Sequence, residues 1–440
     1  MRYLGLAFKN LFRSPKRSLT LGVNYAIVAF VMTALLAFAR GAASNVSTSL
    51  VRASAGHLTV SGQYAASGRV YGGMLRAPEV ASIARRELGE GAQVLPRYLV
   101  RSAVYKGGLS KRLSFTGIDA SIDRGFETQM RFSQGSWAEW AADPNGVALT
   151  EAQAAYFGIG AGDELVISLR SRFGAFNTGI ARVRGVYATD NYFMRDLALA
   201  HFAFLRGLDL APEDAATAIY AYLPRASEAG AARERLEAAL AAAGFETSRP
   251  ASDAEAISAV SAASIRYETD KEGRDRVMLT LSTLDEVLGL VRSVLGAVSA
   301  VGALVAAVML LVIAASIFIN LRMSVNERLR EIGTMRAIGV ESSAVSGLFV
   351  LEAALLALSF SLAGSALGAL ACLAFRLAAS FPPGGSLAVF LDAGRLALEP
   401  RLGDMAAISA AIAAFAAAFA WLPARRGGRV APVEALNSAF

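Results

Sequence analysis

Cysteine is almost absent from this chain, whose 440 residues include only one, Cys372. That residue lies inside an apolar stretch, so the long polar segment before it has no thiol and cannot be stabilised by a disulfide. Residues 40–285 must therefore be held together by a hydrophobic core, and they are long enough to form one.

Charge is also scarce. Charged residues make up 18% of the chain and hydrophobic residues 55%, and the mean hydropathy is +0.44. The hydrophobic share and the mean hydropathy are higher than in an ordinary soluble domain, and the charged share is lower. The net charge of +7 could suggest nucleic acid as a partner. The basic residues gather at the ends of apolar stretches, however, rather than along one soluble face, so we expect no nucleic acid partner.

Motifs for catalysis and nucleotide binding are missing as well. The dipeptide Gly-Lys, which a Walker A loop requires, does not occur. The two histidines, His57 and His201, lie far apart and outside any motif that would pair them with a nucleophile or metal ligands. We expect no catalytic residue, cofactor or metal in this chain, and no ATP hydrolysis by this chain alone.

What the chain does have is four apolar stretches, each long enough to cross a bilayer as a helix. They span residues 19–39, 294–319, 346–375 and 405–422. The first could instead be a cleaved signal peptide, because Ala37, Phe38 and Ala39 form an A-x-A pattern. Its length and its lack of proline favour an uncleaved anchor.

Basic residues predict the orientation of these spans by the positive-inside rule. Only Arg40 and Arg52 lie close to the far side of the first span, whereas five basic residues precede it: Arg2, Lys9, Arg13, Lys16 and Arg17. The segment 320–345 and the C-terminal tail are also rich in arginine. We therefore expect both termini to be cytoplasmic and the domain at 40–285 to be periplasmic.

Residues 1–18 read as a cytoplasmic amphipathic helix, which Pro15 ends before the first span. Within the inserted domain, alternating segments predict strands at 57–61, 93–104, 111–118, 164–169, 181–187 and 216–223. Helical periodicity occurs at 78–88, 150–157 and 226–243. The domain is therefore mixed α+β. Residues 253–292 also read as helical, which predicts a helical stalk running into the second span, with a possible break near Gly273.

The sharpest polar signal lies between the second and third spans. At helical spacing, one face of residues 325–339 is apolar, and the other is polar with Glu327, Arg330, Glu331 and Thr334. The apolar face comprises Val325, Leu329, Ile332, Met335 and Ile338. Such a helix could merely lie at the membrane interface, or it could dock into a groove of a soluble partner.

These residues resemble a known family. The run from Asn320 to Glu352, with N-E-R-L-R-E-I-G-T-M-R-A-I-G at its centre, is similar to the core of FtsX-like ABC transporter permeases. The tail at 422–426 and 431–436 resembles the closing motif of that family. Residues 146–151 and 158–165 resemble the periplasmic domain of macrolide-exporter (MacB-type) and lipoprotein-releasing (LolC/LolE-type) permeases.

The resemblance implies a type VII, mechanotransmission architecture. Two permease subunits, identical or different, would pair in the membrane and contact its lipids. An ABC ATPase dimer, which binds ATP and Mg, would lie beneath them. Residues 286–440 would form the FtsX-like permease domain, and 326–339 its coupling helix. The residues expected to contact the ATPase are Glu327, Arg328, Arg330, Glu331, Gly333, Met335, Arg336 and Gly339. Glu352, Gly364 and Gly368 are expected to have structural roles within the membrane.

The resemblance leaves the cargo open. Lipoprotein release from the inner membrane is our first expectation, because the chain shows no fused ATPase segment like that of macrolide exporters. Efflux of drugs, peptides or lipids is an alternative, and a non-transporting regulator of an envelope hydrolase or sensor is another. The resemblance also implies a periplasmic carrier or an outer-membrane partner, but the stretch Ser171 to Gly179 lacks the proline of the carrier-binding hook of lipoprotein-releasing permeases.

Overall fold

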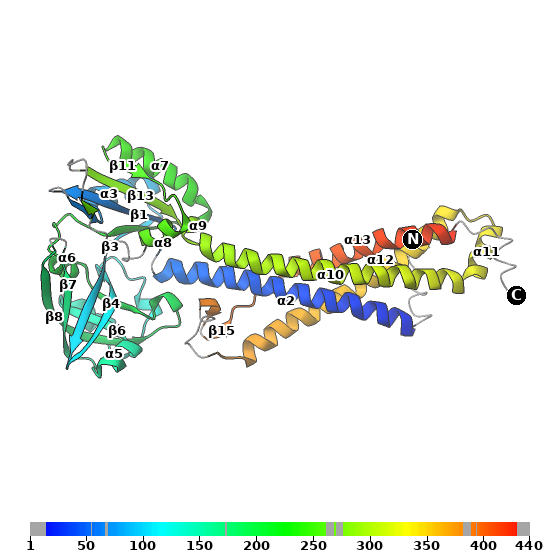
Figure 1. Cartoon of the computed structure of the whole chain (residues 1–440), viewed down its shortest axis with the longest axis horizontal. Coiled ribbons are helices and arrows are strands. Elements are labelled where there is room, and N and C mark those ends of the chain that lie inside the picture. The colour runs from blue at the N-terminus through cyan, green and yellow to red at the C-terminus, as the bar shows by residue number, and fades with distance from the viewer. Residues whose placement is uncertain are drawn as a thin grey trace. The chain divides into compact units, whose positions relative to one another are not determined.

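The computed structural model describes residues 15–53, 55–66, 69–171, 174–260, 268–269, 276–381, 389–392 and 394–428. They divide into two compact units (Figure 1). The helical unit contains the described parts of Met1–Ala43, Val294–Phe381 and Arg395–Phe440. The inserted domain contains those of Ser44–Ser293 and Pro382–Gly394.

Four long apolar helices provide candidate membrane spans. They are α2 (Pro15–Ala53), α10 (Gly289–Glu327), α12 (Ser342–Ala378) and α13 (Leu402–Gly428). Each contains a window of high hydropathy that is long enough to cross a bilayer. The predicted fold class, four spans with a mixed α+β domain inserted between the first and second, is confirmed and is consistent with a type VII architecture.

The helices are longer than the apolar stretches that predicted them. The prediction ended the first span at residue 39, whereas α2 continues as one helix to Ala53. Helical hydrogen bonding does not stop where hydropathy falls, since polar residues also form helices outside the hydrocarbon core. Likewise Pro423 lies inside α13 rather than ending it.

The inserted domain is built on a large mixed sheet. Its strands follow the order β11-β13-β1-β10-β3-β4-β9-β6-β8-β5; β7 pairs with β3 and β8, and β2 with β1 and β12. The strands of this sheet are β1 (Leu58–Ala66), β2 (Arg69–Gly72), β3 (Gln93–Lys106), β4 (Leu109–Ile118), β5 (Arg131–Gly135), β6 (Gly146–Thr150), β7 (Glu164–Arg170), β8 (Phe176–Ala188), β9 (Leu197–His201), β10 (Ala218–Tyr222), β11 (Glu246–Ser248), β12 (Glu268–Thr269) and β13 (Arg276–Thr283). Two further short strands lie outside it: β14 (Leu391–Asp392) belongs to the inserted domain, and β15 (Arg395–Leu396) belongs to the helical unit.

Short helices cover parts of this sheet. They are α3 (Ala77–Leu88), α4 (Trp137–Ala142), α5 (Glu151–Phe157), α6 (Phe202–Leu208), α7 (Ala229–Ala242), α8 (Asp253–Val260) and α9 (Leu284–Val287), with 3₁₀ turns at Glu127–Gln129, Tyr192–Met194 and Ala226–Glu228. The strands and helices predicted between residues 57 and 243 are all present, although their ends differ by a few residues. The short strands β5, β6 and β9 and the helices α4 and α6 were not predicted.

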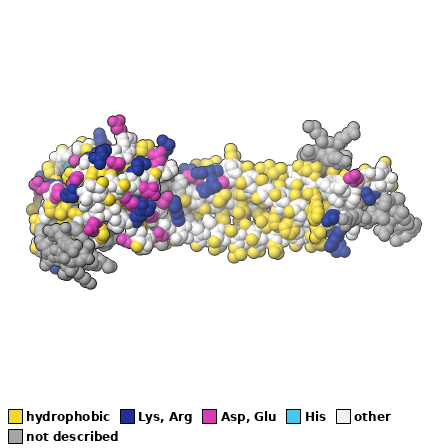
Figure 2. All heavy atoms as spheres, turned by 90° about the horizontal axis from the view of Figure 1, so that it is seen from above, with side chains coloured by type: hydrophobic (Ala, Val, Ile, Leu, Met, Phe, Trp, Pro, Cys, Tyr) yellow, Lys and Arg dark blue, Asp and Glu magenta, His cyan; other side chains and the backbone are white. Residues whose placement is uncertain are grey.

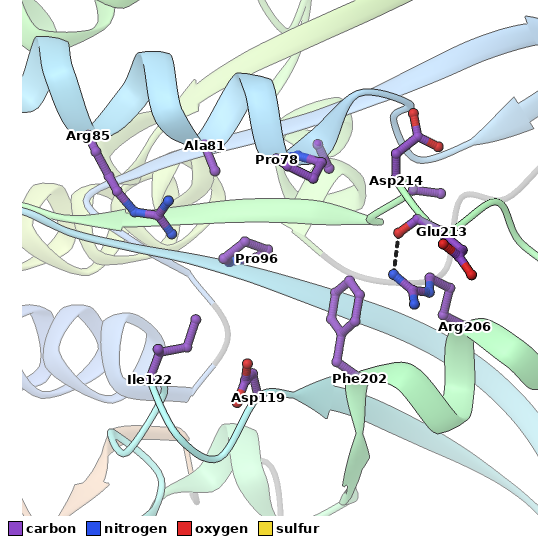
Figure 3. Close-up of a pocket in the computed structure, with 12 residues that line it drawn as sticks. Pro78, Ala81, Arg85, Pro96, Asp119, Ile122, Phe202, Arg206, Glu213 and Asp214 are labelled. Carbon is purple, nitrogen blue, oxygen red and sulfur yellow. Dashed lines mark hydrogen bonds between the residues drawn. The ribbon is translucent and has the colours of Figure 1, made fainter.

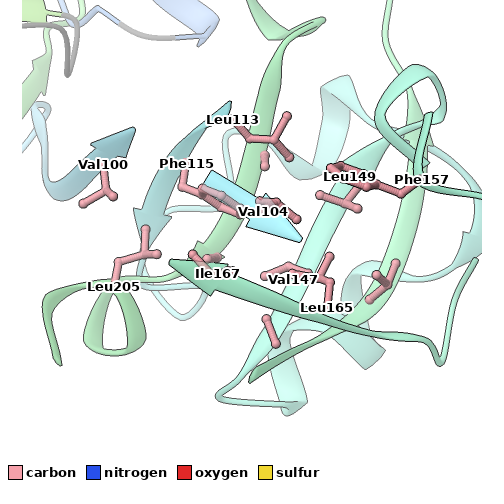
Figure 4. Close-up of a cluster of buried hydrophobic side chains, with 14 of the residues drawn as sticks. Val100, Val104, Leu113, Phe115, Val147, Leu149, Phe157, Leu165, Ile167 and Leu205 are labelled. Atoms are coloured by element: carbon pink, nitrogen blue, oxygen red, sulfur yellow. The ribbon is translucent and has the colours of Figure 1, made fainter. Parts of the chain in front are cut away.

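The two largest hydrophobic clusters of the inserted domain lie on its sheet. In one, alternate residues of β3, β4, β6 and β7 pack against α5 and α6 (Figure 4). Val104, Val147 and Ile167 are completely buried there. In the other, α3 and α7 cover β1, β10 and β13. This meets the expectation that the domain would rely on a hydrophobic core rather than disulfides.

The predicted helical stalk is wrong. Residues Arg276–Thr283 form strand β13, which pairs antiparallel with β1 from Leu58 to Ala65. The sequence alternates there, and Leu279 and Leu281 are both fully buried on one face, which is the periodicity of a strand. The helix resumes at α9, where Thr283 and Glu286 form a capping box.

The α9 cap is strengthened by charge. The Glu286 carboxylate accepts from the Thr283 N–H at 2.8 Å and pairs with Arg233. Burial acts to raise the pKa of Glu286, but these bonds outweigh it and hold that pKa below the ordinary value. Three other predicted features lie outside the described residues: residues 1–14 of the helix predicted over 1–18, the break near Gly273 and the closing motif at 431–436. The expectation that Pro15 ends that first helix is wrong, because α2 begins at Pro15 and includes residues 15–18.

A fully buried ion pair joins three segments of the inserted domain. The Arg97 Nε donates to Asp123 at 2.7 Å, and one Nη donates to the same carboxylate at 3.3 Å and to the Tyr222 hydroxyl at 3.0 Å. The guanidinium also lies over the rings of Phe126 and Tyr220. Nothing in the sequence pattern had indicated this cluster.

Candidate functional site

The segment between α10 and α12 is the part of the helical unit that the sequence singled out. It was predicted as one helix over 326–339. Instead α10 ends at Glu327, and a separate helix α11 (Leu329–Ala337) follows. Between them Arg328 has φ −107° and ψ 16°, outside the helical region, so the helix is interrupted at that residue. The prediction of a single continuous helix is therefore wrong.

One side of α11 packs inward. Ile332 is fully buried, and Met335 packs against the same cluster, which includes Val345 and Phe349 of α12 and Ala424 of α13. The Ser346 hydroxyl ties α12 to α13 by donating to the Ala424 carbonyl at 3.1 Å. This confirms the apolar side predicted for Ile332 and Met335, and α11 packs against two spans.

A glycine ends α11. Gly339 has φ 95°, a left-handed conformation that other residues rarely adopt. Its N–H donates to the Arg336 carbonyl and the Val340 N–H donates to the Met335 carbonyl, which together form a Schellman motif. The family resemblance assigned Gly339 to contact with the ATPase, but in this structure it terminates the helix.

The other side of α11 and its two ends are exposed. Glu327, Arg330, Glu331 and Thr334 all face away from the spans. Ile338, which the helical pattern assigned to the apolar side, has 83% of its surface exposed. That assignment is wrong because the helix ends at Ala337 and no longer carries residue 338 round to the buried side. The exposed surface thus combines charges of both signs with one large apolar side chain.

Three of the predicted contact residues lie partly or fully inside the unit. Gly333 is buried, and Arg336 is half-buried and donates to the Val340 carbonyl at 3.0 Å. Arg328 is directed to α12, where its Nη1 donates to the Glu352 carboxylate at 3.3 Å. These residues can shape the exposed surface of α11, but they do not form it.

Glu352 is the only acidic residue of α12. Its side chain is 20% exposed, and that of its partner Arg328 is 16% exposed. Burying a carboxylate at the end of a span is costly unless it is paired. The pair explains why a charge is tolerated there, and it connects two residues that are 24 positions apart.

Gly364 and Gly368 allow α12 to approach α2. A Cβ on Gly364 would lie 2.2 Å from the carbonyl oxygen of Ala26, and one on Gly368 would lie 2.9 Å from that of Phe30. Both clashes are with backbone, which cannot move aside as a side chain could. The G-x-x-x-G pattern is therefore a contact between helices in this chain.

On the face seen in Figure 2, the exposed side chains along the spans are mostly apolar. Along α10, Val301, Leu304 and Leu311 are all more than half exposed, as they would be in contact with lipid tails or another apolar helix. Charged side chains in the helical unit gather near the ends of the spans.

The inserted domain has a pocket of about 240 Å³ between α3 and α6 (Figure 3). Pro78 and Arg85 of α3 line one side, and Phe202 and Arg206 of α6 line the other. Arg206 is engaged with the Glu213 carbonyl. The pocket mixes apolar walls with charges of both signs, and its lining defines no single ligand.

The two histidines have structural partners. The Nδ1 of His57 accepts from the Leu223 N–H at 2.8 Å, and burial lowers the pKa of His57. His201 stacks on Trp140 with ring centroids 4.7 Å apart. Among the described residues, no group of three or more His, Cys, Asp or Glu side chains could hold a metal ion.

The C-terminal part of the chain matches a known protein family. Residues 303–432 match the family model described as FtsX-like permease C-terminal. A stretch of 116 residues is 37% identical to the macrolide export ATP-binding/permease proteins MacB 1 of Yersinia pestis bv. Antiqua (strain Antiqua) and of Yersinia pseudotuberculosis serotype I (strain IP32953). The match covers 26% of this chain and 15% of each relative.

Two solved structures are similar to parts of the chain. The periplasmic region of MacB from Actinobacillus actinomycetemcomitans is 11% identical with a TM-score of 0.32, covering 55% of this chain and 95% of that one. The extracellular domain of the noncanonic ABC-type transporter YknZ from Gram-positive bacteria is also 11% identical. Its TM-score is 0.30, covering 42% of this chain and 95% of that one.

Proposed function

We propose that this chain, an FtsX-like permease of the MacB type, is the membrane subunit of an ABC transporter driven by separate ATPase subunits. The observation that carries the proposal is the exposed side of α11, a short helix between two spans within the matched residues 303–432. An exposed amphipathic helix of this kind fits a groove on a soluble protein. ATP and Mg²⁺ would be bound by the ATPase.

The chemistry of the exposed side suits such a contact. Glu327, Arg330 and Glu331 offer charges of both signs, which favour one orientation of the partner and reject others. Ile338 offers an apolar side chain that could fill a pocket on the ATPase, as the centres of protein interfaces require. We assign recognition of the ATPase to this set, and the shaping of the helix to Arg328, Gly333, Met335, Arg336 and Gly339.

Arginines near α11 and at the end of α13 predict the orientation of the protein in the membrane. Arg322, Arg330 and Arg336 lie around α11, and Arg425 and Arg426 lie at the C-terminal end of α13. By the positive-inside rule these ends are cytoplasmic. In the proposed arrangement the protein crosses the inner membrane four times, both termini are cytoplasmic and the inserted domain is periplasmic.

Movement would reach the inserted domain through helices. Helix α10 is continuous over 39 residues. At about 1.5 Å per residue it is roughly 58 Å long, about twice the hydrocarbon thickness of a bilayer. A displacement of α11 would therefore be carried along α10 past the membrane. A second permease, alike or different, would provide the other half of the transporter.

The proposal also concerns which cargo the transporter moves. Lipoprotein release remains our first choice. Export of drugs, peptides or lipids is supported equally, because the MacB relatives are macrolide export proteins by name. Transfer to a soluble carrier would need a docking surface. Two apolar side chains of β8, Phe176 and Ile180, are exposed beside the hairpin that joins β7 to β8. Regulation of an envelope hydrolase or sensor is the alternative from another class.

Charge reversal tests the assignment to α11. We expect Arg330→Glu to lower permease-dependent ATP turnover at least roughly tenfold in the complex that co-purifies from native membranes, because a repulsive contact would replace an attractive one. Arg401→Glu is the control, since Arg401 is exposed but lies before α13 rather than near α11. Unchanged turnover and unchanged co-purification with Arg330→Glu would remove the proposed role.

A second experiment separates the classes of function. The complex in vesicles, supplied with ATP, should release a lipid-anchored protein or expel a dye-labelled drug or peptide. If cargo never moves, while a cell-wall hydrolase becomes active only when the complex is present, the chain is a regulator and not a transporter.

A further inference from the structure

We propose that the ion pair between Arg328 and Glu352 positions α11, by fixing the interrupted end of α10 to the start of α12. This inference rests on the proposed function, because it gives the pair a role in transmitting ATP-driven movement. Neither residue would touch the ATPase. Their role would be to set the direction in which the exposed side of α11 is presented.

The backbone at Arg328 provides the hinge. The Arg328 N–H donates to the carbonyl of Val325, three residues back, and the helical bonds of α11 begin with Ile332 N–H donating to the Arg328 carbonyl at 2.9 Å. One residue therefore separates two helices without a proline or glycine. A break of this kind lets the helices change their relative angle unless another contact holds them.

The side chain at the hinge provides that contact. The Arg328 side chain extends from the break itself to Glu352, so the pair fixes the one residue whose dihedral angles set the angle between α10 and α11. Beside it, the apolar cluster of Ile332, Val345 and Phe349 supplies packing but little direction, since apolar contacts are not directional. A charge-assisted hydrogen bond is directional and so selects one angle.

The location of the pair distinguishes it from an ordinary surface pair. Both side chains are at least four-fifths buried, and Glu352 is one of only two charged residues in α12. Arg328 also approaches Glu331, but at 3.9 Å and with a partner that is 46% exposed, which is a weaker interaction. Water screens the Arg328–Glu352 pair less than the Arg328–Glu331 pair. The pair with Glu352 therefore controls the hinge.

Hydrogen exchange of the full-length protein in lipid nanodiscs tests the positioning directly. Glu352→Gln keeps the shape of the side chain and removes its charge. We expect exchange of the α11 amides to rise roughly tenfold, while exchange at the centres of α12 and α13 stays unchanged. The double variant Arg328→Glu/Glu352→Arg should restore the native rate, because it rebuilds the pair with opposite polarity. The control is Arg376→Gln, which changes the other charge of α12.

The second readout is ATP turnover in the complex with its ATPase. Glu352→Gln should retain the ATPase but lose permease-dependent turnover at least fivefold, and the charge swap should recover most of it. A purely structural role would lower the melting temperature without this recovery.

Two results would overturn the inference: α11 exchange that does not respond to Glu352→Gln, or raised exchange that leaves turnover intact. If turnover of the wild-type complex does not depend on this chain at all, it is the proposed function that fails, and the exchange result still decides whether the pair holds the hinge.

Discussion

The inserted domain and the helical unit each contain an ion pair away from bulk water, but the two pairs are built differently. Arg97 donates twice to Asp123 and once to Tyr222, lies over aromatic rings and is 1% exposed. Arg328 reaches Glu352 at 3.3 Å at the edge of an apolar cluster. One pair is fully buried inside a core, and the other is partly exposed at a helix break.

This difference indicates different tasks. A fully buried, multiply bonded pair holds strands together and opens only with the core, because either charge alone would be stranded. A partly exposed pair at a break can open without unfolding its surroundings. The inserted domain is thus expected to move as a rigid piece, while the helical unit is adjustable at one defined point.

Removing Arg97 should give the largest effect. Arg97→Met leaves Asp123 without its partner in the core, and we expect the free energy of opening of β3 and β10 to fall by about 3–5 kcal/mol. Hydrogen exchange of those amides in the full-length protein measures it. The control is Arg249→Met, which breaks an exposed pair with Glu237 and should cost less than about 1 kcal/mol. Equal losses in the two variants would contradict the distinction.

Adding a methyl group to the close contact between α12 and α2 should give the second largest effect. Gly364→Ala places a Cβ against the Ala26 backbone, so the helices must separate, at a cost of about 1–3 kcal/mol. Gly347→Ala is a matched control in the same helix, because a Cβ there meets nothing within 4 Å. Thermal unfolding in detergent compares the two. A Gly364→Ala protein as stable as Gly347→Ala would mean that the spans do not pack as described.

Acidification should give the smallest effect, confined to the inserted domain. Burial lowers the pKa of His57 from its ordinary 6.5, and the neutral ring accepts from the Leu223 N–H. The unfolded chain therefore binds the proton more readily, so stability is complete above pH 6.5 and falls as the pH drops toward the folded-state pKa. We expect a loss below about 1 kcal/mol, since the ring is only partly buried.

Exchange of the β1 and β10 amides between pH 7 and 5, corrected for intrinsic rates, detects this loss. His57→Asn keeps an acceptor for the Leu223 N–H but cannot titrate, so the step should disappear in that variant. The carboxylates with lowered pKa, namely Glu79, Asp143, Asp190 and Glu286, titrate at lower pH and do not contribute to it. A step that persists in His57→Asn belongs to another group.

Much of the fold could be predicted because periodicity is local. Hydropathy located the four spans, and alternation located β3, β4 and β7. The stalk prediction failed at 276–283, where leucines spaced for a strand were read as helical together with the rest of residues 253–292. Tertiary pairing with β1, which no local pattern contains, decided that segment.

The candidate site was predicted in position but not in detail. The sequence identified residues 325–339, the buried Ile332 and the exposed Arg330. It did not reveal the interruption at Arg328, because no proline or glycine marks it, nor the exposure of Ile338, which depends on where α11 ends. The pairing of Arg328 with Glu352 needed the third span in place, although a lone carboxylate in an apolar helix was a sign that a partner existed.

Cross-linking from Ile338 is the most direct test of the central claim, that the exposed side of α11 docks onto an ATPase. The background is Cys372→Ala, which removes the only cysteine. In it, Ile338→Cys and, for comparison, Phe176→Cys of the inserted domain are treated with a short cysteine-to-amine cross-linker in native membranes. We predict that Ile338→Cys captures the ATPase subunit and that Phe176→Cys does not. Capture of the ATPase from position 176, or its absence at 338 in a complex that still assembles, would contradict the account.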